Sequence, residues 1–163
     1  MYTEPIGLLD CNNFFVSCER AFRPDWRRRP VVVLSSNDGC VIARSQEIKD
    51  SGIPMGVPYF KIKDSLKDME AVACSANLTL YRDLSRRVFE IMRAKLSSVE
   101  QYSIDEAFFL VPPDGDVLAI AAELQAVIVQ SLGLPVSIGI GQSKTQAKFA
   151  NRCTKQTGQV TIW

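Results

Sequence analysis

Two adjacent carboxylates, Asp105 and Glu106, lie inside an aromatic, strand-forming segment that spans residues 102–110. A third carboxylate, Asp10, ends the apolar run of residues 6–9. If the first strand pairs with the later segment, the three side chains meet although 95 positions separate Asp10 from Asp105. Three carboxylates with no histidine favour Mg²⁺ or Mn²⁺ over Zn²⁺. Two such ions about 4 Å apart can activate a 3′-hydroxyl and stabilise a leaving pyrophosphate.

Each of these carboxylates also has a purely structural interpretation. The Asp105–Glu106 pair, taken alone, fits a solvated turn between two strands. Asp10, taken alone, fits the N-cap of a helix that begins near Phe14. Without metal, the three side chains would repel one another, which raises carboxylate pKa values. The prediction of a metal site therefore depends on whether the fold brings the three together.

The composition excludes several classes of catalytic site. The chain has 163 residues, 47% hydrophobic, with a formal net charge of +1, as expected for a soluble protein with one sizeable core. It contains no histidine, which excludes a Ser-His-Asp triad, a Cys-His dyad and histidine metal sites. Its five cysteines include no Cys-x-x-Cys pair, which argues against a disulfide framework or a zinc site and favours the cytoplasm. No apolar run could span a bilayer, and residues 1–5 show no signal-peptide pattern.

The pattern of apolar residues predicts both helices and strands. We expect a long amphipathic helix with Asn77 as its N-cap and a second amphipathic helix over residues 117–132. Residues 136–140 alternate as a strand does, and Ser143 with Gln146 has the capping-box spacing that begins a third helix. Further strands are expected at 6–9, 31–34, 40–43, 72–74 and 160–162.

Residues 11–70 interrupt this order as a long insertion after the first strand. With the insertion set aside, the remainder fits a ferredoxin-like βαββαβ core with its helices on one face, so the predicted fold class is α+β. In that topology the first strand lies beside the central hairpin. Because functional residues are often placed in insertions at strand ends, the insertion is itself a candidate for part of the site.

A basic stripe follows the third predicted helix. Lys144, Lys148, Arg152 and Lys155 recur at helical spacing, which places them on one side of the helix. The stripe begins next to a predicted tight turn at residues 139–143, whose glycines allow close approach to a phosphate at the helix N-terminus. We predict nucleic-acid binding by Lys144, Lys148 and Arg152. A solvated helix face is the competing interpretation of the same residues.

Two aromatic residues, Phe14 and Phe15, begin a predicted helix shortly after Asp10. Rings in the first turn of a helix more often belong to the core than to a ligand site. Close to a metal-bound nucleotide, however, a rigid ring can exclude a sugar that carries a 2′-hydroxyl. Such a clash would select deoxyribonucleotides.

Three segments together resemble the Y-family translesion DNA polymerases. They are Leu-Leu-Asp-x-Asn-x-Phe-Phe-x-x-Cys-Glu at residues 8–19, residues 29–44, and Tyr-Ser-Ile-Asp-Glu-Ala-Phe at residues 102–108. The stretch Asn-Asp-Gly-Cys-Val-Ile-Ala-Arg at 37–44 is similar to the UmuC branch, the catalytic subunits of bacterial DNA polymerase V. The resemblance extends over essentially the whole chain.

The resemblance implies roles for individual residues. Asp10, Asp105 and Glu106 would bind two catalytic Mg²⁺ ions, for which Mn²⁺ can substitute, with the backbone carbonyl of Cys11 as a further ligand. Phe15 would be the steric gate for the sugar. The other residues expected along the nucleotide are Asn13, Phe14, Lys49 and Lys155.

Two features depart from the family pattern. Other branches have a Tyr-x-x-Arg pair in the fingers, where this chain has Gln46 and Lys49, so a bidentate guanidinium is replaced by a single ammonium. Phe15 stands where Tyr is frequent, which keeps the ring and removes a hydroxyl.

By the same resemblance, residues 1–10 and 71–163 form the palm and residues 11–70 the fingers. The thumb and little-finger domains that grip DNA in the family are expected to be absent. Because phosphate contacts supply affinity in proportion to their number, we expect weak or absent activity for the chain by itself.

The function implied is template-directed DNA synthesis across damaged DNA, by a two-metal mechanism, during the SOS response. The substrates would be primer–template DNA and deoxynucleoside triphosphates. The expected partners are a UmuD-like subunit, a recombinase filament and a sliding clamp, with no membrane and a cytoplasmic location. One alternative is a naturally truncated, non-catalytic protein of the DNA-damage response that acts by binding a partner. A palm-type nucleotidyl cyclase is disfavoured, because the chain lacks a Gly-Gly-Asp/Glu-Glu-Phe hairpin.

Overall fold

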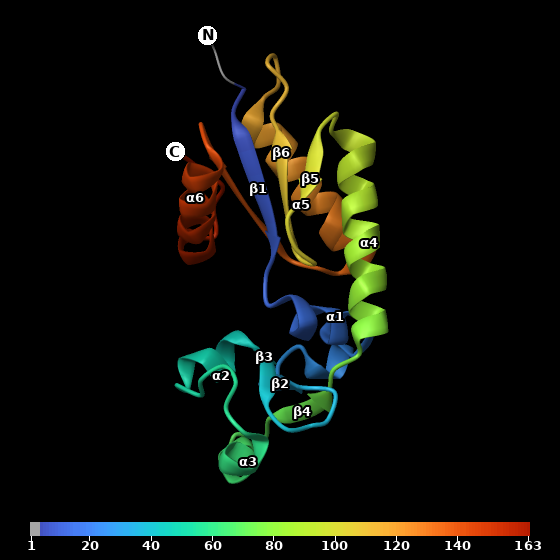
Figure 1. Ribbon diagram of the computed structural model, residues 1–163, viewed down its shortest axis with the longest axis vertical. Helices are drawn as coiled ribbons and strands as arrows, with labels where there is room; N and C mark the ends of the chain where they lie inside the picture. Colours follow the sequence, from blue (N-terminus) through green and yellow to red (C-terminus); the bar gives the residue numbers. More distant parts are fainter. Residues whose placement is uncertain (1–3) are drawn as a thin grey trace. The chain divides into compact units, whose positions relative to one another are not determined.

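The computed structural model describes residues 4–163, which divide into two compact units (Figure 1). The first unit consists of the residues up to Asn12 together with Arg82–Trp163, and the second is Asn13–Tyr81. The sequence predicts boundaries after residues 10 and 70, and the division lies further along the chain at both places. Residues 1–3 of the predicted first segment lie outside the described residues.

A five-stranded sheet forms the centre of the first unit. Its strand order is β5-β6-β1-β7-β8, with β1 antiparallel to both β6 and β7. The first four strands in this order have the arrangement of a ferredoxin-like βαββαβ fold, which confirms the predicted α+β class. The fifth strand, β8, pairs in parallel with β7. The strands are β1 Ile6–Cys11, β5 Val99–Gln101, β6 Glu106–Leu110, β7 Val136–Gly141 and β8 Thr161–Ile162.

The helices of this part of the chain begin at the predicted signals. They are α4 Leu78–Lys95, α5 Val117–Leu132 and α6 Lys144–Thr157. Asn77 Oδ1 accepts a hydrogen bond from the Leu80 N–H, at 3.1 Å. Ser143 Oγ accepts one from the Gln146 N–H, and Gln146 Oε1 accepts one in return from Gln142 N–H. The predicted capping residues of α4 and α6 are confirmed.

The helices are not all on one face of the sheet, which corrects the expectation from the sequence. Figure 1 shows α4 and α5 on one side of the strands and α6 on the other. On the α6 side, Leu8 and Phe108 pack against Ala147. A Cβ added at Gly139 would lie 2.1 Å from the backbone nitrogen of Asn151. The backbones of β7 and α6 are therefore in direct contact, a packing that a larger residue in place of Gly139 would prevent.

The second unit contains a three-stranded sheet of order β3-β2-β4. β2 and β3 form the predicted antiparallel hairpin. β4 pairs in parallel with β2, so the small strand that the sequence assigns to the βαββαβ core belongs to the sheet of the insertion instead. The elements are α1 Phe14–Phe22, the 3₁₀ helix η1 Pro24–Trp26, β2 Val31–Leu34, β3 Val41–Arg44, α2 Gln46–Asp50, α3 Tyr59–Asp68 and β4 Val72–Ser75. The buried hydrophobic cluster of the second unit comprises Val32, Leu34, Val41, Ile48, Ile53, Ile62 and Leu66.

No helix within residues 4–163 combines the length and the apolar character needed to cross a membrane.

Candidate functional site

The strand register brings the predicted carboxylates to one end of the β1–β6 pair. Asp10 lies directly opposite Glu106 on β6 and opposite Ser137 on β7. The next residue, Cys11, donates its backbone N–H to the Asp105 carbonyl, at 2.9 Å. The predicted pairing of the first strand with the 102–110 segment is thus confirmed, and the 95-residue gap in sequence closes in the fold.

Ser103 connects the two adjacent carboxylates, although it is not among the site residues predicted from the sequence. Its Oγ lies 3.0 Å from Asp105 Oδ1 and 3.1 Å from Glu106 Oε2. A hydroxyl carries one proton, so it can donate to only one of the two at a time. The turn itself is held from α4, where Ser85 Oγ donates to the carbonyl of Ile104. The only signal in the sequence was that Ser103 lies two positions before Asp105.

Asp10 is the most buried of the three carboxylates, with 9% of its surface exposed. Burial, with smaller contributions from the charges of Asp105 and Glu106, raises the pKa of Asp10 to about 6 despite an opposing effect of Lys155. Lys155 Nζ forms an ion pair with Asp10 Oδ1, at 3.0 Å. Burial also raises the pKa of Asp105, against the hydrogen bond from Ser103. The surroundings of Asp10 and Asp105 therefore disfavour the charged forms of both carboxylates.

The chemical nature of these ligand atoms suits a hard divalent cation. Its side-chain donors are carboxylate oxygens, which Mg²⁺ and Mn²⁺ prefer. Within residues 4–163, however, no three acidic or cysteine side chains already have the spacing of a metal site. Lys155 forms an ion pair with Asp10, and the Ser103 hydroxyl lies between Asp105 and Glu106. A divalent cation would have to displace the Lys155 ammonium from Asp10.

The second unit brings together two residues that the sequence assigns to the nucleotide. Lys49 Nζ donates to Asn13 Oδ1, at 2.5 Å, although 36 positions separate them. Asn13 has a left-handed backbone conformation, with φ of 44°, immediately before α1. Phe14 is 4% exposed, so its side chain belongs to the core and only its backbone is available for a ligand.

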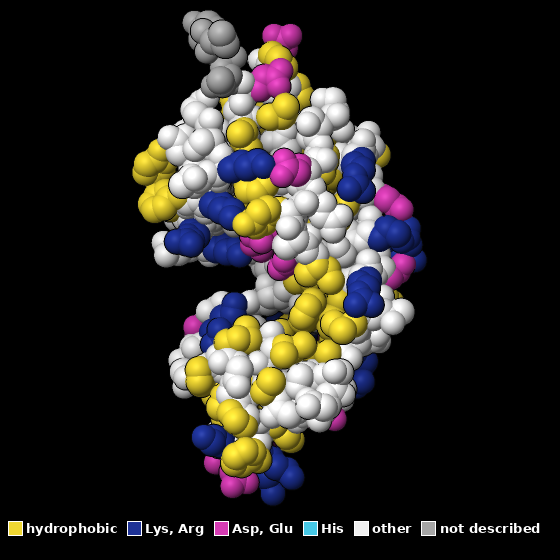
Figure 2. All heavy atoms as spheres, viewed as in Figure 1, with side chains coloured by type: hydrophobic (Ala, Val, Ile, Leu, Met, Phe, Trp, Pro, Cys, Tyr) yellow, Lys and Arg dark blue, Asp and Glu magenta, His cyan; other side chains and the backbone are white. Residues whose placement is uncertain are grey.

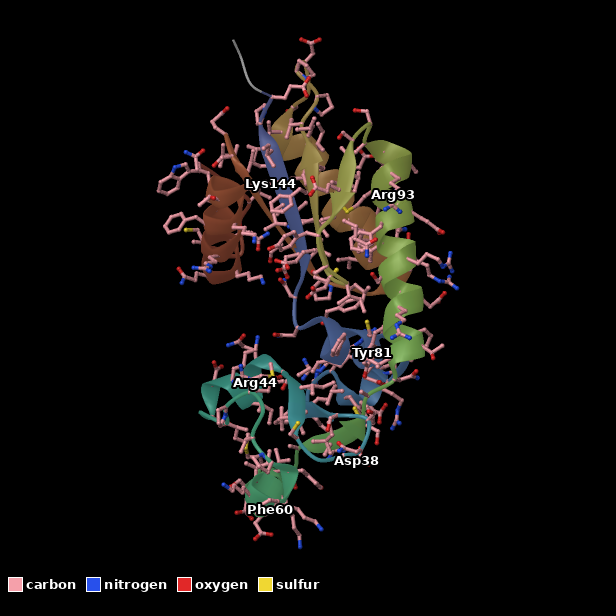
Figure 3. The ribbon with its side chains drawn as sticks, in the orientation of Figure 1. Asp38, Arg44, Phe60, Tyr81, Arg93 and Lys144 are labelled. Carbon is pink, nitrogen blue, oxygen red and sulfur yellow. The ribbon has the colours of Figure 1, made fainter. Side chains whose placement is uncertain are left out.

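Phe15 is half-buried and stacks on the ring of Tyr81, a residue of α4. The Phe15 and Tyr81 ring centroids are 4.4 Å apart with an interplanar angle of 15°. Tyr81, labelled in Figure 3, is fully buried, and its hydroxyl donates to Glu19 Oε1, at 2.8 Å. Burial raises the pKa of Tyr81, which keeps the hydroxyl protonated as a donor. Tyr81 and Glu19 thereby limit the movement of Phe15.

The basic stripe on α6 has two kinds of neighbours. Figure 2 shows the Lys and Arg side chains gathered over α6, beside acidic and apolar side chains. Lys144 forms an ion pair with Glu100 on β5, at 2.8 and 2.9 Å to the two oxygens, and Lys155 pairs with Asp10. Lys148 instead lies over the Tyr102 ring, 4.1 Å from its centroid, and Arg152 is exposed. The stripe is therefore not a uniformly solvated face.

Comparison with known proteins identifies the family. The model of the impB/mucB/samB family matches residues 9–152. The protein UmuC of Salmonella typhimurium is 46% identical over 153 residues, which cover 92% of this chain and 36% of that protein. DNA polymerase IV of Corynebacterium diphtheriae is 37% identical over 157 residues, which cover 92% of this chain and 34% of that protein. The chain thus spans about a third of the length of these curated relatives.

The solved structures agree with the fold. The crystal structure of DinB from Sulfolobus solfataricus superposes with a TM-score of 0.87 at 21% identity, over 98% of this chain and 48% of that one. The insertion ternary complex of Dbh DNA polymerase gives the same values. Because the family model matches most of the sequence and the fold is shared, this chain belongs to the impB/mucB/samB family.

Proposed function

We propose that this chain supplies the catalytic part of a UmuC-like translesion DNA polymerase, which transfers deoxynucleotides to a primer opposite damaged template bases. The observation that carries the proposal is the register of β1 against β6, which places Asp10 opposite Glu106. The relatives named UmuC and DNA polymerase IV support the reaction class. In this proposal the first unit is the palm and the second unit is the fingers.

The residues of the first unit would hold the metal ions. Asp10, Asp105 and Glu106 are the proposed ligands, with the carbonyl oxygen of Cys11. When bound, two Mg²⁺ ions would lower the pKa of the attacking hydroxyl and neutralise the leaving pyrophosphate. Ser103 would fix the rotamers of the two adjacent carboxylates, since its Oγ lies within 3.1 Å of both. Lys155 would compensate the charge of Asp10 in the absence of metal and then become available to the triphosphate.

The residues of the second unit would act on the incoming nucleotide. Lys49 would neutralise phosphate charge, and its hydrogen bond to Asn13 holds the ammonium in a fixed place beforehand. The Phe15 ring would exclude the 2′-hydroxyl of a ribonucleotide. The UmuD-like subunit, the recombinase filament and the sliding clamp stay predictions from the resemblance.

Metal binding provides a direct test. Mn²⁺ is titrated into the wild-type chain, the Asp105→Ala variant and an Asp114→Ala control, and free Mn²⁺ is followed by electron paramagnetic resonance. Asp114 is an exposed carboxylate in the turn before α5, so its loss should leave the affinity unchanged. We expect at least a tenfold weaker affinity for Asp105→Ala, about 1.4 kcal/mol. Equal affinity in all three proteins would refute the metal assignment.

A further inference from the structure

An aromatic and basic platform lies beside the acidic turn on the α6 side of the sheet. We define the Tyr102 platform as five residues from β5, β6, α6 and the turn between the two strands: Glu100, Tyr102, Phe108, Lys144 and Lys148. The ring of Tyr102 meets that of Phe108 edge to face, with centroids 5.4 Å apart and an interplanar angle of 72°. Phe108 is buried, whereas Tyr102 is 54% exposed. One ring thus anchors the other at the surface.

The two lysines of the platform differ in how their charge is used. Lys144, labelled in Figure 3, holds both oxygens of Glu100, so its charge is largely balanced. Lys148 Nζ lies 4.1 Å from the centroid of Tyr102 and 5.9 Å from that of Phe108. A cation over aromatic faces is attracted by only about 0.5–1 kcal/mol at an exposed site. Lys148 is therefore held beside the Tyr102 ring and remains able to bind an anion.

The platform is fixed in position relative to the carboxylates. The backbone N–H groups of Tyr102 and Ser103 both donate to the carbonyl of Glu106, at 3.0 and 3.1 Å. Tyr102 therefore belongs to the same hydrogen-bonded turn as Asp105. A group bound on the Tyr102 ring would be held at a defined place next to the acidic turn.

A nucleotide has the complementary chemistry. It presents a flat base and an apolar sugar edge, which can pack on an aromatic ring. Its negatively charged phosphate lies close to both and can bind the ammonium beside that ring. Exposed aromatic side chains beside lysines bind single nucleic-acid strands in this way, and each stacked base contributes about 1–3 kcal/mol. If Tyr102 served only to cover Phe108, the unneutralised ammonium of Lys148 over its ring would have no purpose.

We propose that Tyr102 and Lys148 bind the 3′-terminal nucleotides of the DNA strand that is to be extended. Tyr102 packs against the last base or sugar, and Lys148 moves from the ring to the adjoining phosphate. The inference rests on the proposed function, because the carboxylates beside Tyr102 define which end of the strand lies there. It adds an aromatic contact to the predicted basic stripe and removes Lys144 from the phosphate-binding residues.

Binding of short DNA duplexes tests the proposal. Nitrogen-15 NMR titrations of the chain use one duplex with a recessed 3′ end and one with a recessed 5′ end. The variants are Tyr102→Ala, Tyr102→Phe and Lys148→Met. The controls are Leu118→Ala, which removes an exposed apolar side chain, and Lys63→Met, which removes an exposed charge on α3. Unchanged spectra of the free variants show that the fold is intact.

We expect Tyr102→Ala to weaken binding of the recessed 3′ duplex at least about fivefold, while Tyr102→Phe stays within twofold of wild type. Lys148→Met should lower the slope of log affinity against log salt by about one, and the controls should change neither quantity. Equal affinities for wild type and Tyr102→Ala would overturn the proposal, as would no binding by wild type. An equal loss for both duplexes would overturn the assignment to the 3′ terminus.

The test is separable from that of the proposed function. If Asp105→Ala leaves Mn²⁺ affinity unchanged while Tyr102→Ala loses the recessed 3′ duplex, the metal assignment fails and the strand site stands. If Mn²⁺ affinity depends on Asp105 but DNA affinity does not depend on Tyr102, the platform is structural and the polymerase assignment stands.

Discussion

Replacing Asp10 by Asn should stabilise the protein in the absence of metal, although Asp10 is a proposed metal ligand. The folded-state pKa of this carboxyl is about 6, against 3.8 for an unperturbed one. A raised pKa means that the folded state binds more protons than the unfolded state between these two values. Stability therefore falls as pH rises through this window, and the loss is complete above pH 6. Two units of pKa correspond to about 3 kcal/mol.

Asn has nearly the same shape as a protonated Asp, so Asp10→Asn removes the cost of burying the charge. The variant also loses the ion pair with Lys155, but the raised pKa of Asp10 already includes the opposing effect of Lys155, so this loss needs no separate correction. We expect a gain of about 3 kcal/mol in the free energy of unfolding at pH 8 and about 0.5 kcal/mol at pH 4.

Urea unfolding followed by circular dichroism in EDTA measures both values, with Asp114→Asn as the control for an exposed carboxylate. The reasoning is refuted if Asp10→Asn is no more stable than wild type at pH 8. It is also refuted if the gain is the same at pH 4 and pH 8. Excess Mg²⁺ should reduce the difference, since a cation that binds Asp10 stabilises the folded wild type alone.

Three further outcomes follow from other contacts. Gly139→Ala should prevent folding or lower stability by more than 3 kcal/mol, because a Cβ there would lie 2.1 Å from Asn151 N; thermal unfolding measures this. Asn151→Ala should cost about 2–3 kcal/mol, since its buried Nδ2 donates to the carbonyls of Leu8 and Ser137; a loss under 0.5 kcal/mol would contradict the assigned bonds. Phe15→Ala should raise the affinity for ATP relative to dATP, and an unchanged ratio in calorimetric titrations would refute the gate.

The sequence predicts best the features that depend on nearby residues or on topology. The caps at Asn77 and Ser143 could be located because a capping residue and its partner lie three positions apart. The meeting of Asp10 with Glu106 followed from the βαββαβ topology, in which the first strand has few possible neighbours. These two kinds of signal were enough to find the carboxylates.

The features that were missed depend on contacts between distant segments. Nothing local to β4 indicates that it pairs with β2 rather than with the first unit's sheet. The stack of Phe15 on Tyr81 joins residues 66 positions apart, and each ring separately has the pattern of a core residue. The helical spacing of Lys155 predicts a surface position. Its ion pair with Asp10 depends on the approach of α6 to β1.

The close contact between α6 and β7 has a consequence for how the sequence can diverge. The inner side of α6 carries Ala147, Ala150 and Asn151, all buried, and it meets glycines of β7. Larger residues on that side would separate helix and strand, so few replacements are compatible with the fold. The outer side carries exposed residues such as Arg152, which can change without structural cost. The charge of the outer side can therefore change while the orientation of the helix stays constant.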